Sequence, residues 1–75
     1  MTFMARTKDK IFFAAWVIEA YKRKHGLTGE QTIILFSKKK INEWLFENFD
    51  VLHTVGTDYV ISEIEDILKT AEKHD

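Results

Sequence analysis

The chain has 75 residues, enough for one small domain and too few for most enzymes. It lacks cysteine, which excludes disulfides and thiolate metal sites, and its 45% apolar and 31% charged residues indicate a globular protein. The net charge of −1 is unevenly divided: residues 1–40 hold nine basic and three acidic residues (+6), and residues 41–75 hold two and nine (−7). We expect folding to bring the halves together so that these charges neutralise each other, although such polarity can also steer a partner.

The first predicted element is a helix over residues 7–25, preceded by residues 1–6, which we expect to be flexible. Basic residues fill its last turn and Gly26 follows, an arrangement that suits the helix dipole and a glycine C-cap. Apolar residues occupy most of its circumference, which is typical of a central helix buried on several sides. A buried strand is the competing interpretation of the apolar run Ile11 to Ile18. The run is too short to cross a bilayer, so we expect a cytoplasmic protein without a membrane segment.

Two further helices are predicted in the middle of the chain. Thr28 and Gln31 have the spacing of a capping box, which opens a helix over residues 28–38. A third helix is predicted over residues 41–49, because apolar residues recur there at intervals of four. No helix breaker separates the two, so one bent helix is an alternative.

The pattern changes after Asp50. β-branched and aromatic residues on both sides of Gly56-Thr57 predict a β-hairpin over residues 51–61, with a type II′ turn. A second capping-box pattern then opens a last helix over residues 62–73, although this helix could instead begin at Asp58. The predicted fold is therefore mainly α, a single domain over residues 1–75 with three to four helices and a short β-hairpin before the C-terminal helix. This order of elements also resembles a winged helix.

Four residues around the predicted hairpin are interpreted as a structural corner and not as a site. Asp50 can accept backbone N–H groups in a turn, and Leu52 is expected to enter the core. His53 is expected to form a local hydrogen bond, and Gly56 to supply a positive φ.

No catalytic, cofactor-binding or metal-binding residues are predicted. His25, His53 and His74 lie in different elements, without the close spacing of metal ligands. The sequence contains no G-x-S-x-G, P-loop or G-x-G-x-x-G motif. We therefore expect a non-enzymatic protein that needs no cofactor.

Aromatic side chains are the main indication of function. Ten aromatic residues are more than so small a core can bury, and surface aromatics are typical anchors of protein interfaces. We expect Trp16 and Phe49 to reach the core, and Phe12, Trp44 or Phe46 to be partly exposed. The candidate partner interface comprises Phe12, Trp16, Trp44 and Phe46. The simpler explanation is that large side chains fill a small core from few residues.

An alternative function is DNA binding by a small winged-helix-type regulator, with Lys38, Lys39 and Lys40 as candidate phosphate contacts. Against it, Glu43 and Glu47 are expected on the outer face of the would-be recognition helix, where phosphates would repel them. The favoured interpretation is a module that binds a protein partner or a second copy of itself, with nucleic acid less favoured.

Three stretches of the second half, Asn48 to Gly56, Tyr59 to Ile61 and Glu63 to Ile67, resemble a family of small uncharacterised bacterial proteins, the domain of unknown function 3791. The element Asp-Val-Leu-His-Thr-x-Gly within the first stretch is the most specific part. Ile18 to Lys22 and Leu35-Phe36 resemble the first half of the family, so the similarity covers roughly residues 10 to 68.

The resemblance implies no catalytic residues. Some members of the family are encoded beside ADP-ribosyltransferase-like or other toxin-like proteins, which implies an accessory or antitoxin-like role in binding a partner. The chain departs from the family at Lys40, where the family often has glycine between two helices. This departure argues against a tight turn at that point.

Overall fold

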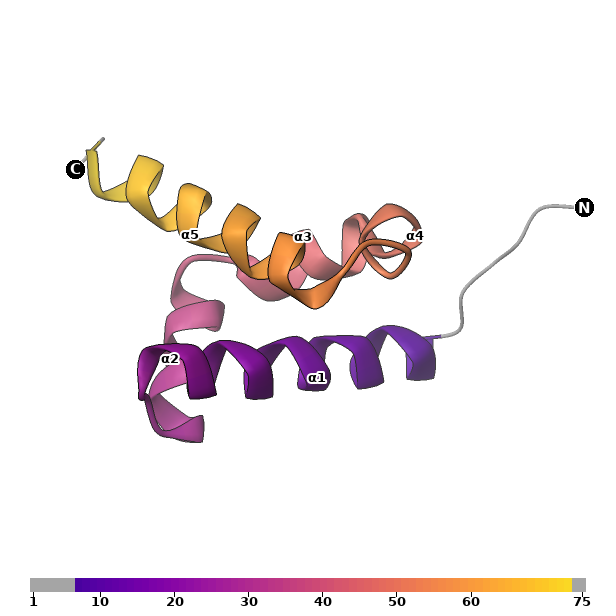
Figure 1. Ribbon diagram of the computed structural model, residues 1–75, viewed down its shortest axis with the longest axis horizontal. Coiled ribbons are helices and arrows are strands. Elements are labelled where there is room, and N and C mark those ends of the chain that lie inside the picture. The colour runs from indigo at the N-terminus through magenta and orange to yellow at the C-terminus, as the bar shows by residue number, and fades with distance from the viewer. Residues whose placement is uncertain (1–6, 74–75) are drawn as a thin grey trace, which may run out of the picture.

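A computed structural model describes residues 7–73, with side chains described to residue 70, and these residues form five helices (Figure 1). The helices are α1 (Thr7–His25), α2 (Gly29–Lys38), α3 (Ile41–Glu47), α4 (Phe49–Leu52) and α5 (Thr57–Lys73). Helix α1 packs against α2, α3 and α5 and is the centre of the fold. The expectation for residues 1–6 lies outside the described residues.

Helix α1 spans the residues of the first predicted helix and ends as its sequence indicates. Gly26 adopts a left-handed conformation with φ of +63°, and the Leu27 amide donates to the Lys22 carbonyl at 3.0 Å, which closes the last turn. Ala14, Val17 and Tyr21 form its buried face. Burial on several sides is only partly realised, because large apolar side chains on the remaining faces are exposed.

The turn between α2 and α3 corrects one expectation. The capping box that opens α2 is present, since Thr28 Oγ1 accepts the Gln31 amide at 3.0 Å and Gln31 Oε1 accepts the Thr28 amide at 2.9 Å. At the other end of α2, Lys40 adopts a left-handed conformation with φ of 57° and ψ of 31°. A lysine therefore makes the tight turn that the absence of glycine argued against, and α2 and α3 are two separate helices.

The third predicted helix is divided at Asn48, which has φ of −109° and ψ of 17°. The Asn48 side-chain amide donates to the Trp44 backbone carbonyl at 2.9 Å. The backbone carbonyl of Asn48 accepts the Leu52 amide, also at 2.9 Å. Asn48 thus closes α3 and opens the single-turn helix α4, which contains Phe49.

The predicted β-hairpin is wrong: no strand occurs among the described residues, and α4 and the first turns of α5 occupy this stretch. Val60, Ile61 and Ile64 are buried, with Ile67 and Leu68 partly buried against the same core. This spacing is that of one helix face, so the burial of a continuous stripe outweighs the preference of β-branched residues for strands. The alternative that began the last helix at Asp58 is close to the structure. Without a hairpin there is no wing, so the winged-helix order is also wrong.

The core lies between α1 and the helices that face it. Its fully buried side chains come from every helix except α4, which contributes the nearly buried Phe49 and Leu52. The largest are Phe36, Ile41, Leu45, Ile64, Val17 and Val60. Phe13 meets Phe49 edge to face at 5.4 Å, and Tyr21 meets Phe36 at 5.3 Å, so aromatic pairs fasten α1 to α4 and to α2.

Candidate functional site

The four aromatic residues of the candidate interface separate into two pairs. Phe12 and Trp16 lie one turn apart on α1 with 63% and 67% of their surface exposed. Trp44 and Phe46 on α3 are partly buried and pack against the core. The expectation that Trp16 reaches the core is therefore wrong, whereas Phe49 is buried.

Trp16 is exposed but held in place. Its indole N–H donates to the Thr57 hydroxyl at 3.0 Å, which links α1 to the first residue of α5. A shallow hollow of about 350 Å³ adjoins the ring and is lined by Trp16, Glu19, Ala20 and Arg23. An aromatic ring that is fixed in orientation before it meets a partner loses little conformational entropy on binding.

Charged residues next to this aromatic pair are already matched. Glu19 accepts Lys22 Nζ at 3.1 Å and Arg23 Nε at 3.3 Å. The Lys22 hydrogen bond, followed by the contacts with Arg23, holds the pKa of Glu19 below its usual value. The Phe12–Trp16 surface, by which we mean these two exposed aromatic side chains on α1, therefore borders a group of paired charges, one carboxylate and two cations.

The residues of the predicted corner lie in and after α4. Asp50 is exposed inside α4, with no hydrogen bond to its carboxylate among the described residues, and Leu52 is buried. The His53 ring stacks on Phe49 at 4.6 Å, and its Nδ1 lies 2.7 Å from the Phe49 carbonyl oxygen. Gly56 precedes α5 without a positive φ, so the conformational reason given for it is wrong.

The three candidate phosphate contacts occupy the end of α2 and the turn after it. Lys38 and Lys40 are exposed, and Lys39 is partly buried. Together they form a basic turn, but no strand of the described chain stands beside it as a wing.

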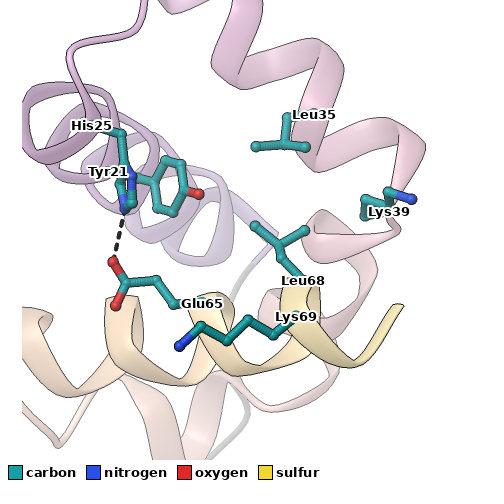
Figure 2. A pocket seen from close by; sticks show the side chains of 7 residues that line it. All are labelled: Tyr21, His25, Leu35, Lys39, Glu65, Leu68 and Lys69. Carbon is teal, nitrogen blue, oxygen red and sulfur yellow. Dashed lines mark hydrogen bonds and ion pairs between the residues drawn. The ribbon is translucent and has the colours of Figure 1, made fainter. Parts of the chain in front are cut away.

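A separate pocket of about 450 Å³ lies between α1, α2 and α5 (Figure 2). Tyr21 is nearly buried at its base, stacked against the His25 ring at 4.2 Å. Across the pocket, His25 Nε2 lies 2.7 Å from Glu65 Oε2, which also accepts Lys24 Nζ at 3.0 Å. The remaining lining residues are Leu35, Lys39, Leu68 and Lys69.

The pocket contains a His–Glu pair, and its lining includes Tyr21, Lys39 and Lys69 but no serine, threonine or cysteine. The hydrogen bonds from Lys24 and then His25 hold the pKa of Glu65 below its usual value, so the carboxylate is stabilised in its charged form. This cluster fastens the C-terminal turn of α1 to α5. Sequence reasoning missed it because His25 and Glu65 are 40 residues apart and no local motif connects them.

Two other kinds of site find no support in the described part of the chain. No group of three or more histidine, cysteine, aspartate or glutamate side chains there could hold a metal ion. No described helix combines the length and apolar character needed to cross a membrane.

The described residues therefore form an all-helical domain with an exposed aromatic surface and a shallow pocket. Residues 12–71 match the family described as "Protein of unknown function (DUF3791)", and the chain belongs to this family. The resemblance seen in the sequence is thereby confirmed. No curated protein and no solved structure matches the chain.

Proposed function

We propose that the protein is a non-enzymatic, cytoplasmic module that binds another protein through the Phe12–Trp16 surface. The observation that carries this proposal is the state of Trp16, an indole ring that is two-thirds exposed and yet anchored to Thr57. Tryptophan is enriched among the residues that dominate binding energy at protein interfaces. The partner offers an apolar cavity for the two rings.

The family resemblance supports a partner from the toxin-like proteins encoded beside some members, which would make this chain an accessory or antitoxin-like subunit. The His–Glu pair in the pocket of Figure 2 has no serine, threonine or cysteine beside it, which supports a binding role over hydrolysis of the Ser–His or Cys–His type. Loss of the predicted wing removes one of the two features that favoured DNA binding and leaves only the basic turn.

The experiment is purification of the tagged protein from its native host, followed by mass spectrometry and titration of the purified partner. Phe12→Glu places a charge in the proposed surface and is expected to weaken binding by at least about tenfold, since hot-spot residues commonly contribute that much. Ile34→Glu is the matched control, because Ile34 on α2 is similarly exposed at 56% and lies outside the proposed surface. A partner that binds Phe12→Glu as tightly as wild type, or no partner at all, would overturn the proposal.

A further inference from the structure

A second apolar surface lies on a different face of α1, where α1 meets α3. It is a groove of about 320 Å³ lined by Ile11, Ala14, Ala15, Ile18, Asn42 and Phe46. Ile11 is 54% exposed and Ala15 is exposed, whereas Phe46 is partly buried. The groove thus has an apolar floor that the described residues leave open to water.

The α3 side of the groove carries two carboxylates and a buried side-chain oxygen that lacks a hydrogen-bond donor among the described residues. Asn42 and Phe46 also line an adjoining hollow of about 290 Å³, together with Glu43 and Glu47. Both carboxylates belong to exposed residues and form no ion pair with another described residue. The Asn42 side-chain oxygen is buried and accepts no hydrogen bond from a described residue. An occupant of the groove should therefore bring apolar side chains, flanking cations and a hydrogen-bond donor.

Helix α1 itself has this combination. Ile11, Ala15 and Ile18 line the groove, and the same helical spacing extends this seam to Lys8 before it and Lys22 after it, with successive spacings of three, four, three and four. This is the spacing with which helices pack side by side. The order Lys, Ile, Ala, Ile, Lys is the same in both directions, and each lysine lies seven residues from Ala15, about 10 Å along the helix. A seam that reads alike in both directions is suited to a two-fold axis at its centre.

We propose that the groove binds α1 of a second copy, so that two α1 helices pack antiparallel about a two-fold axis near Ala15. The small alanine allows the helices to approach closely, and the isoleucines of each copy fill the groove of the other. In Figure 1, α1 and α3 run in opposite directions. The second copy's α1 therefore runs parallel to α3, and its two lysines pass the acidic rim formed by Glu43 and Glu47.

Electrostatics agree with this arrangement. The lysine ends of the two α1 helices would repel each other, and the α3 carboxylates offset that repulsion. Lys22 already pairs with Glu19, but Arg23 pairs with the same carboxylate, so Glu19 keeps a partner if Lys22 turns towards the second copy. The dimer leaves the Phe12–Trp16 surface free and does not depend on its proposed function.

The first test is the oligomeric state of the full chain by sedimentation velocity, at concentrations up to about 100 μM so that micromolar affinities are detected. Wild type is expected to be a dimer. Ala15→Glu is expected to weaken the dimer by at least about tenfold, because a carboxylate would be buried unpaired on the axis. Phe12→Glu is the matched control: it introduces the same charge at an exposed position of the same helix and should leave the dimer intact. A monomeric wild type, or a dimer lost in Phe12→Glu and kept in Ala15→Glu, would overturn the proposal.

The second test exchanges the charges. Glu43→Lys/Glu47→Lys makes the rim basic, and Lys8→Glu/Lys22→Glu makes the seam acidic, so each double variant alone is expected to be monomeric. Mixing the two restores opposite charges at both rims and should yield a one-to-one heterodimer. Circular dichroism checks that each variant is helical. If both double variants remain dimeric alone, or if their mixture stays monomeric, the proposed pairing is refuted.

Discussion

Lys40→Gly is expected to stabilise the protein. Lys40 holds a left-handed conformation in the turn between α2 and α3, with φ of 57°. A residue with a Cβ atom loses about 1–2 kcal/mol in this region of φ/ψ space. The Lys40 side chain is exposed and forms no hydrogen bond or ion pair with a described residue, so its removal loses little.

The magnitude is set by two opposing effects. Glycine removes the strain, but it also has more freedom in the unfolded chain, which costs roughly 0.5–1 kcal/mol relative to alanine. The free energy of unfolding should therefore rise by about 0.5–1 kcal/mol. For a domain of this size the corresponding increase in Tm is roughly 2–8 °C.

The assay is urea unfolding followed by circular dichroism, with Lys40→Ala as the matched control. Alanine removes the same charge and the same methylenes but keeps the strained backbone, so only glycine should stabilise. Lys38→Gly, at the last residue of α2, should destabilise, because there glycine gains no conformational relief. The reasoning is refuted if Lys40→Gly is no more stable than Lys40→Ala.

Three further substitutions test other parts of the fold. Leu52→Ala should lower the free energy of unfolding by about 2–5 kcal/mol in urea titrations, because Leu52 is 4% exposed and its truncation leaves a cavity; a loss below 1 kcal/mol would contradict its burial. Gly56→Ser should not destabilise in the same titrations, since Gly56 has no positive φ, no atom lies within 4 Å of an added Cβ, and serine suits the residue before a helix; a clear loss would indicate strain. Glu65→Gln should lower Tm at neutral pH but not in acid. The Lys24 and His25 contacts hold the pKa of Glu65 below its usual value of 4.5, so the charged carboxylate stabilises the fold above that pH. This contribution is lost as the pH falls through the lowered pKa. A Tm difference that persists in acid would contradict it.

The helix ends that sequence predicted well depend on local chemistry. Thr28 and Gln31 are three residues apart, and Gly26 follows a basic last turn, so the signals and the atoms that bond lie within one helical turn. Such contacts need no tertiary context. They were found because a capping box and a glycine C-cap are the same structure in every helix.

The hairpin was predicted wrongly because the stretch Tyr59-Val60-Ile61 suits both strands and helices. In isolation its β-branched residues favour a strand. Only together with Ile64, Ile67 and Leu68 does it form the continuous stripe that α5 buries against the core. What decides between strand and helix is the apolar surface buried over about three turns, from Val60 to Leu68, and a short stretch taken alone does not reveal it.

The exposure of Trp16 illustrates a second limit. Every position of α1 from Ile11 to Ile18 is apolar, so periodicity alone does not distinguish the face that meets the other helices from the faces that meet water. The hydrogen bond between Trp16 and Thr57 joins residues 41 positions apart, so no local sequence pattern predicts it. The candidate interface could thus be predicted as a set of aromatic residues, but not as a surface.

The uneven charge of the chain bears on what that surface meets. Neutralisation of the basic half by the acidic half within one molecule was the simpler expectation. Among the described residues, Glu65 is the only acid of the second half that forms an ion pair with the first half, through Lys24 and His25. Glu19 is paired within α1, whereas the α3 carboxylates have no ion-pair partner among these residues. Among the described residues, direct ion pairing between the two halves is therefore confined to the cluster around Glu65. Because opposite charges on two surfaces attract, the unpaired α3 carboxylates are the reason that the dimer proposed above brings lysines of the second copy to them.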